Sequence, residues 1–69
     1  RLQEWLQGRK MALPDYELTH VSGKDHEQHF IVTCTVTEKS VSTHGESTTR
    51  RKAEQEAAQR MTELLVGQE

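Results

Sequence analysis

A stretch of ten residues in the middle of the chain carries an apolar side chain at every second position from Phe30 to Val36, which is typical of a β-strand with one buried face. The stretch is QHFIVTCTVT, residues 28–37. One face carries the apolar side chains of Phe30, Val32, Cys34 and Val36. Two weaker strand patterns flank it, at residues 15–22 and 41–46. Three antiparallel strands with a single apolar face need a cover on that face, which restricts the chain to a layered fold.

Two helical segments can supply this cover. Residues 1–10, RLQEWLQGRK, place apolar side chains at helical spacing, namely those of Leu2, Trp5 and Leu6. Pro14 prevents this helix from continuing. At 100° per residue, the last segment carries an apolar stripe formed by Ala53, Ala57, Ala58, Met61 and Leu65. The sequence therefore predicts one α+β domain over residues 1–69, ordered helix–strand–strand–strand–helix, with both helices packed on one face of a three-stranded antiparallel sheet.

Size and composition limit the classes of function. The 69 residues, of which 32% are hydrophobic, form one small domain with a modest core. The single cysteine, Cys34, excludes an internal disulfide and favours a reducing compartment. The sequence has neither a signal-peptide pattern nor an apolar run near the roughly 20 residues of a membrane span. We therefore expect a cytoplasmic domain with no membrane partner. Because a helical pattern begins at the first residue without a cap, we also expect a segment of a longer protein, with its upstream part missing.

The start of the last helix breaks a helix rule. Arg50, Arg51 and Lys52 open it, although the positive end of a helix dipole favours anions. At 100° per residue, Arg50, Arg51 and Glu54 fall within or beside the apolar sector, where burying a charge is costly. We therefore expect the first turn to project past the end of the sheet. With Thr49 as the expected N-cap, the free N–H groups and the three cations favour a phosphate ligand. The bland alternative is a solvated helix end.

Three stretches of the chain carry a resemblance to a known family. They are LQEWLQGR at the front, GKDHEQHF between the first two strands, and GESTTRRKAEQEAA leading into the last helix. Together with the order of the elements, they resemble the double-stranded-RNA-binding domain. The versions LQE-x-LQ-x-R and RRKAEQ-x-AA look most like the domain at the C-terminus of bacterial ribonuclease III.

The resemblance implies that the chain binds duplex RNA by shape, across about 16 base pairs. Gln3 and Glu4 would meet 2′-hydroxyl groups and base edges in one minor groove. His26 would enter the next minor groove from the loop between the first two strands. Arg50 and Arg51 would contact phosphates across the intervening major groove. The net charge of −2 argues mildly against a nucleic-acid partner, but the cations are bunched at the start of the last helix.

Thr49, Lys52 and Glu54 at the start of the last helix are also expected to belong to the RNA interface. This chain departs from the family pattern at three positions. Lys24 stands where many members have proline, and Ser47 stands where glycine is common. Glu54 stands where many members carry a third phosphate-binding lysine. An acid is usual there in ribonuclease III. We expect Glu54 to weaken RNA binding, because it lies beside the two arginines.

Metal and catalytic sites are weak alternatives within the chain. His26, His29 and Cys34 suggest zinc, but His29 and Cys34 should lie on opposite faces of their strand. The same separation disfavours a Cys–His nucleophile pair, and the acids lack the spacing of a two-metal nuclease site. We expect no catalytic residue, no metal ligand and no cofactor in residues 1–69.

The resemblance also implies a division of labour in a longer chain. The acids and Mg²⁺ of ribonuclease III would lie in an upstream nuclease domain, for which this domain would hold duplex RNA during the processing of ribosomal and messenger RNA. The domain would be monomeric by itself and the parent chain a homodimer. The rival reading is a protein-interaction or dimerisation module of the same fold that has lost RNA binding, which the net charge and Glu54 favour.

Overall fold

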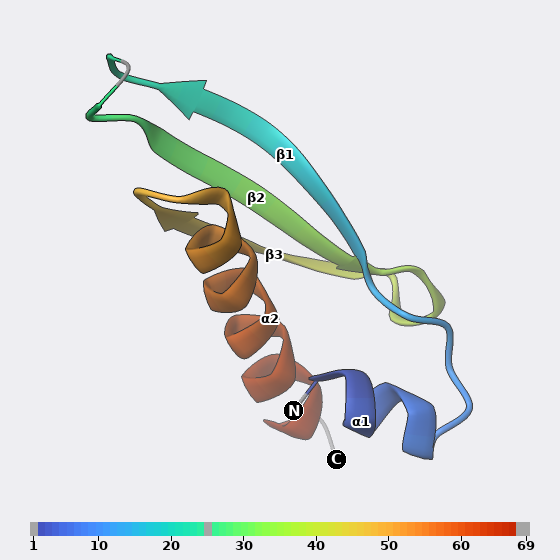
Figure 1. Cartoon of the computed structure of the whole chain (residues 1–69). Helices are drawn as coiled ribbons and strands as arrows, with labels where there is room; N and C mark the ends of the chain where they lie inside the picture. The colour runs from blue at the N-terminus through green and yellow to red at the C-terminus, as the bar shows by residue number, and fades with distance from the viewer. Residues whose placement is uncertain (1, 25, 68–69) are drawn as a thin grey trace.

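The computed structural model describes residues 2–24 and 26–67, which form two α-helices, three strands and one turn of 3-10 helix (Figure 1). The elements in chain order are α1 Leu2–Gly8, β1 Asp15–Ser22, β2 His29–Val36, η1 Thr37–Lys39, β3 Val41–Ser47 and α2 Arg50–Gly67. The strands form one antiparallel sheet in the order β1-β2-β3. The predicted α+β fold, with two helices against a three-stranded sheet, is confirmed.

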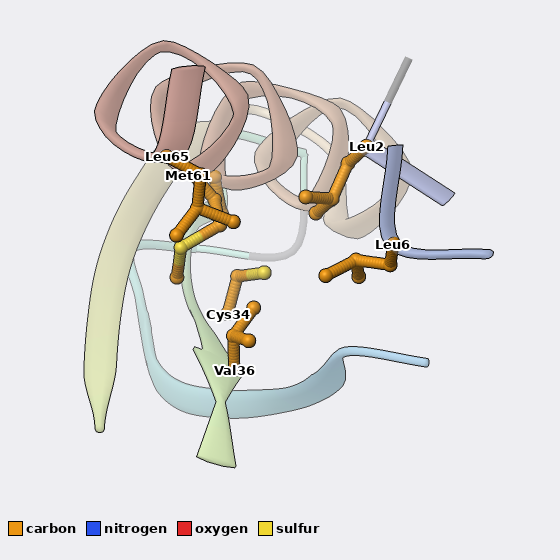
Figure 2. Close-up of a cluster of buried hydrophobic side chains, with 7 residues drawn as sticks. Leu2, Leu6, Cys34, Val36, Met61 and Leu65 are labelled. Carbon is orange, nitrogen blue, oxygen red and sulfur yellow. The ribbon is translucent and has the colours of Figure 1, made fainter. Parts of the chain in front are cut away.

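The core lies between β2 and the two helices, as the alternation of the central strand predicts. Figure 2 shows Leu2 and Leu6 of α1 pointing toward Cys34 and Val36 of β2, with Met61 and Leu65 of α2 beside them. Every side chain in this cluster is at most 4% exposed, and Leu6, Cys34 and Met61 are fully buried. The predicted stripe on α2 is confirmed, since its buried residues are Ala53, Ala57, Met61 and Leu65. Ala58 is only partly buried.

Strand β1 contains an irregularity that its weak alternation does not reveal. Leu18 pairs with Val32 and His20 pairs with the adjacent Ile31, so Thr19 is an extra residue in β1. The Thr19 hydroxyl donates a hydrogen bond to the Ile31 carbonyl at 3.1 Å. Such a bulge shifts the alternation by one residue. Leu18 therefore faces the helices with Val32, whereas His20 lies with Ile31 on the outer face of the sheet.

Helix α2 approaches β3 closely at Gly45. A Cβ atom at this position would collide with the backbone carbonyl oxygen of Ala53 and the backbone nitrogen of Ala57. The neighbouring Thr43 hydroxyl donates a hydrogen bond to the Ala57 carbonyl at 2.7 Å. Glycine is required here because the backbones of the strand and the helix nearly touch. This contact determines where α2 crosses the sheet.

Candidate nucleic-acid interface

Helix α2 begins with an N-cap and a cluster of positive charge. The backbone N–H of Lys52 donates a hydrogen bond to the Thr49 side-chain oxygen at 3.1 Å, which confirms Thr49 as the N-cap. The first intrahelical bond follows at once, from the Ala53 N–H to the Thr49 carbonyl at 3.0 Å. No acidic residue occupies the first turn. The positive end of the helix dipole therefore coincides with Arg50, Arg51 and Lys52.

The three cations differ in how they are paired. The Arg50 Nε donates to the Glu54 Oε2 at 3.1 Å, and more than half of the arginine side chain remains exposed. Arg51 and Lys52 are exposed, and neither has an acidic partner within the described part of the chain. Two cations and the uncapped N–H groups of the first turn are thus open to an anion from outside the protein.

The prediction that the first turn projects past the sheet is wrong. The hairpin of β1 and β2 extends farther than the start of α2 (Figure 1). Arg51 and Glu54 avoid burial for another reason. Helix α2 packs mainly on β2 and β3, so its flank toward β1 remains open. The helical period predicts in which direction a side chain points from the helix axis. Whether that side chain is buried also depends on how far the sheet extends beneath that side of the helix.

A groove runs along this open flank, between α1, α2 and Tyr16 of β1, with a volume of about 730 Å³. Gln3 and Glu4 of α1 line one wall, and Arg51 and Glu54 of α2 line the other. Residues that were expected to contact RNA, and that come from opposite ends of the sequence, therefore lie together on one surface. Most of the residues that line it carry a polar or charged group, which can meet hydrated ligand groups such as hydroxyls and phosphates.

Sequence reasoning missed part of this groove. The additional α2 residues that line it are Gln55, Ala58, Gln59, Thr62 and Glu63. With Arg51, they follow the spacing i, i+4, i+7, i+8, i+11 and i+12, which is one face of a helix. A polar stripe at that spacing next to the cationic turn was the signal that could have found the groove.

His26 lies apart from the groove, in the exposed loop between β1 and β2. Gly23 starts this loop with a φ of 92°, a conformation that favours glycine. The Glu27 N–H closes the turn by donating a hydrogen bond to the Lys24 carbonyl at 2.8 Å. This turn is closed by a backbone hydrogen bond although Lys24, and not a proline, follows Gly23.

Tyr16, which lines the groove, lies in an environment that disfavours the charged form of its hydroxyl. Burial raises the pKa of the Tyr16 hydroxyl from 10.0 to about 12, helped by the neighbouring Cys34 thiol and by Glu54. Burial also raises the pKa of Cys34 above its ordinary 9.0, although a hydrogen bond with Tyr16 opposes this shift. Both groups therefore keep their protons in the folded chain at neutral pH.

These shifts predict a loss of stability at alkaline pH. In the unfolded chain Tyr16 loses its proton near pH 10.0, whereas the folded chain retains it to about pH 12. The stabilising contribution is complete below pH 10 and disappears as the pH rises through the folded pKa. We expect the urea midpoint to fall over this range and to fall less in Tyr16→Phe, which removes the one tyrosine of the chain. An equal fall in both proteins would contradict this assignment.

The zinc alternative can be compared with the positions of its residues. His29 pairs with Glu46 on the outer face of the sheet, whereas Cys34 is buried in the core. The predicted separation of His29 and Cys34 is confirmed. Within residues 2–24 and 26–67, no three His, Cys, Asp or Glu side chains are grouped so that they could hold a metal ion. No helix in the same ranges is long and apolar enough to cross a membrane.

Comparison with known families identifies the class of protein to which this fold belongs. Residues 1–65 match the family model described as the double-stranded RNA binding motif. The chain belongs to this family, and double-stranded RNA is its partner.

Known proteins give a more specific likeness. The chain is 51% identical to Ribonuclease 3 of Xylella fastidiosa (strain M23) over 65 residues, which covers 94% of this chain and 29% of that protein. It is 50% identical to Ribonuclease 3 of Delftia acidovorans (strain DSM 14801 / SPH-1) over 64 residues, 93% of this chain and 28% of that protein. For Ribonuclease 3 of Legionella pneumophila (strain Lens), the values are 52% over 67 residues, 97% and 30%. The predicted likeness to the ribonuclease III domain is confirmed, and the chain spans less than a third of these relatives' length.

Proposed function

We propose that this domain binds duplex RNA by its shape and presents it to a ribonuclease III catalytic domain for endonucleolytic cleavage. The observation that carries the proposal is the capped start of α2, where three cations meet the positive end of the helix dipole. A phosphate backbone supplies the anions that the protein lacks there. Phosphate contacts position a protein without reading sequence, so recognition is expected to depend on duplex geometry.

The proposed contact with RNA involves three surfaces of the domain. Gln3 and Glu4 on α1 meet one minor groove, and the loop that carries His26 meets the next. The start of α2 spans the major-groove phosphates between them. Contacts to 2′-hydroxyl groups favour RNA, because DNA lacks this group and seldom adopts the A-form grooves.

The chemistry of cleavage is proposed to lie elsewhere in a longer protein. The relatives named Ribonuclease 3 are more than three times the length of the matched segment, which leaves room for a nuclease domain. We propose that Mg²⁺ and the catalytic acids belong to that domain and that the parent chain is a homodimer. Its substrates would be precursors of ribosomal and messenger RNA in the cytoplasm, where the free thiol of Cys34 would stay reduced.

Glu54 is proposed to limit the affinity for RNA. Its carboxylate holds Arg50 and adds a negative charge where phosphates would approach. Exposed ion pairs of this kind are worth about 0.2–1 kcal/mol, so Glu54→Gln is expected to tighten RNA binding by up to about fivefold. The salt dependence should also steepen by less than about one unit, because Arg50 no longer shares its charge between Glu54 and a phosphate.

The matched control for Glu54→Gln is Glu63→Gln. It removes the same charge from the same groove, but nine residues farther along α2, or about 13 Å. A smaller change in affinity is expected. Equal gains in the two variants, measured by duplex titration at one fixed salt concentration, would show that only net charge matters.

The position of the RNA on the domain can be tested directly by NMR. A 20-base-pair RNA duplex would be titrated into ¹⁵N-labelled protein while the backbone amides are followed. The proposal expects shifts in three places: at Gln3 and Glu4, around His26, and at residues 49–54. Shifts confined to the outer face of the sheet would overturn the proposed orientation, and a folded domain with no shifts would redirect the search to protein partners.

A further inference from the structure

Strand β3 forms one edge of the sheet and has backbone groups that no strand satisfies. In an antiparallel pair, alternate residues direct both N–H and C=O away from the partner strand. The His44 carbonyl and the Glu46 N–H are bonded to side chains of α2 and not to β2, so both residues direct their groups outward. By alternation Ser42 does the same. Such an edge is a template for pairing with another strand.

Two side chains of α2 cover this edge. The Arg60 Nη1 donates a hydrogen bond to the His44 carbonyl at 2.9 Å. The Glu46 N–H donates to the Glu56 Oε1 at 3.2 Å. The Arg60 Nη2 and the Glu56 Oε1 are themselves joined by an ion pair of 3.0 Å. The Glu56–Arg60 pair therefore occupies one outward N–H donor and one outward C=O acceptor of β3.

The ion pair of Glu56 and Arg60 lies on one flank of α2. Glu56 and Arg60 are one turn apart, so they project from the same side of the helix. Arg51, Gln55 and Gln59 project toward the groove on the other flank. The opposite edge of the sheet needs no similar cover, because the bulge at Thr19 already disrupts β1.

We propose that the Glu56–Arg60 pair guards the β3 edge, and that β3 without this pair associates with β3 of a second copy. A two-fold antiparallel pairing centred on His44 is self-complementary. It places Glu46 opposite Ser42 of the other copy, so the two glutamates do not face each other. In this pairing the N–H of His44 in each copy donates a hydrogen bond to the C=O of His44 in the other copy. The guard lies away from the RNA surface and does not depend on the proposed function.

The test is the double substitution Glu56→Ala/Arg60→Ala, followed by sedimentation equilibrium at protein concentrations up to about 1 mM. The wild-type domain is expected to be monomeric over this range, whereas the variant should approach twice the monomer mass. Amide hydrogen exchange at Ser42, His44 and Glu46 should slow as the variant dimerises. Binding of duplex RNA to the monomeric variant should change less than about threefold.

The matched control is Gln59→Ala/Glu63→Ala, which removes another side-chain pair with i,i+4 spacing from the same helix. This control should stay monomeric. Three results would overturn the proposal: a folded double variant that remains monomeric, a dimer whose β3 amides gain no protection, or a wild-type dimer paired through β3. If the double variant does not fold, Arg60→Ala decides, because it frees the His44 carbonyl and should dimerise more weakly.

Discussion

Replacing both Arg50 and Arg51 by glutamate is expected to weaken the binding of duplex RNA by at least about 100-fold. A hydrogen bond to a charged group contributes about 1.5–3 kcal/mol, and two such contacts would be lost. About 2.7 kcal/mol corresponds to this factor of 100. The slope of log affinity against log salt should become shallower by about 2, because two fewer phosphates are neutralised. Folding should persist, since acids are favourable in the first turn of a helix.

A control with the same change in net charge separates local contacts from long-range repulsion. Lys10→Glu/Lys39→Glu also adds four negative units, at exposed positions outside the predicted contact surfaces. It should weaken binding by less than about tenfold, and salt should remove most of that effect. Equal losses in the two double variants, measured by titration of one RNA duplex at two salt concentrations, would contradict the assignment of the α2 start.

Substituting alanine for Gly45 is expected to abolish most of the folding free energy. Alanine is intrinsically better than glycine within a strand by roughly 0.5–1 kcal/mol, so propensity alone predicts a gain. The steric clash should outweigh this gain, because the added methyl group meets the backbones of Ala53 and Ala57 rather than a movable side chain. Displacing α2 would open the core, and we expect a loss of about 3 kcal/mol or more. A domain of this size has little more than that to lose.

Gly8→Ala is the matched control, because nothing lies within 4 Å of a Cβ atom built there. It should leave stability unchanged or raise it by up to about 1 kcal/mol. Urea unfolding followed by circular dichroism measures both variants. A Gly45→Ala domain as stable as the wild type would show that α2 does not approach β3 as closely as the structure places it.

Much of the fold was predictable because its periodic patterns agree with one another. The alternation along β2 correctly placed Val32, Cys34 and Val36 in the core, and the helical stripe did the same for Met61 and Leu65. Thr49 was recognisable as the N-cap because a short polar side chain precedes a helical pattern. These features depend on local spacing, which the sequence displays directly.

The features that sequence reasoning missed depend on how elements lie beside one another. Arg51 is exposed because α2 packs on β2 and β3 and leaves its flank toward β1 open. The periodicity of α2 does not reveal this arrangement. The hydrogen bonds between β3 and the side chains of Arg60 and Glu56 join residues 10 to 16 positions apart. The bulge at Thr19 adds one residue to β1 without any glycine to mark it. Each of these requires the register between elements, which becomes available only with the fold.

The most direct test of the central claim is the comparison of one 20-base-pair duplex made as RNA and as DNA. Both would be titrated with the wild-type domain at two salt concentrations. The account predicts selective binding of RNA that weakens with salt, with a log–log slope of about −3 to −4 for roughly four phosphate contacts. Equal binding of the two duplexes, or no binding of RNA by a folded domain, would contradict recognition of duplex RNA by shape.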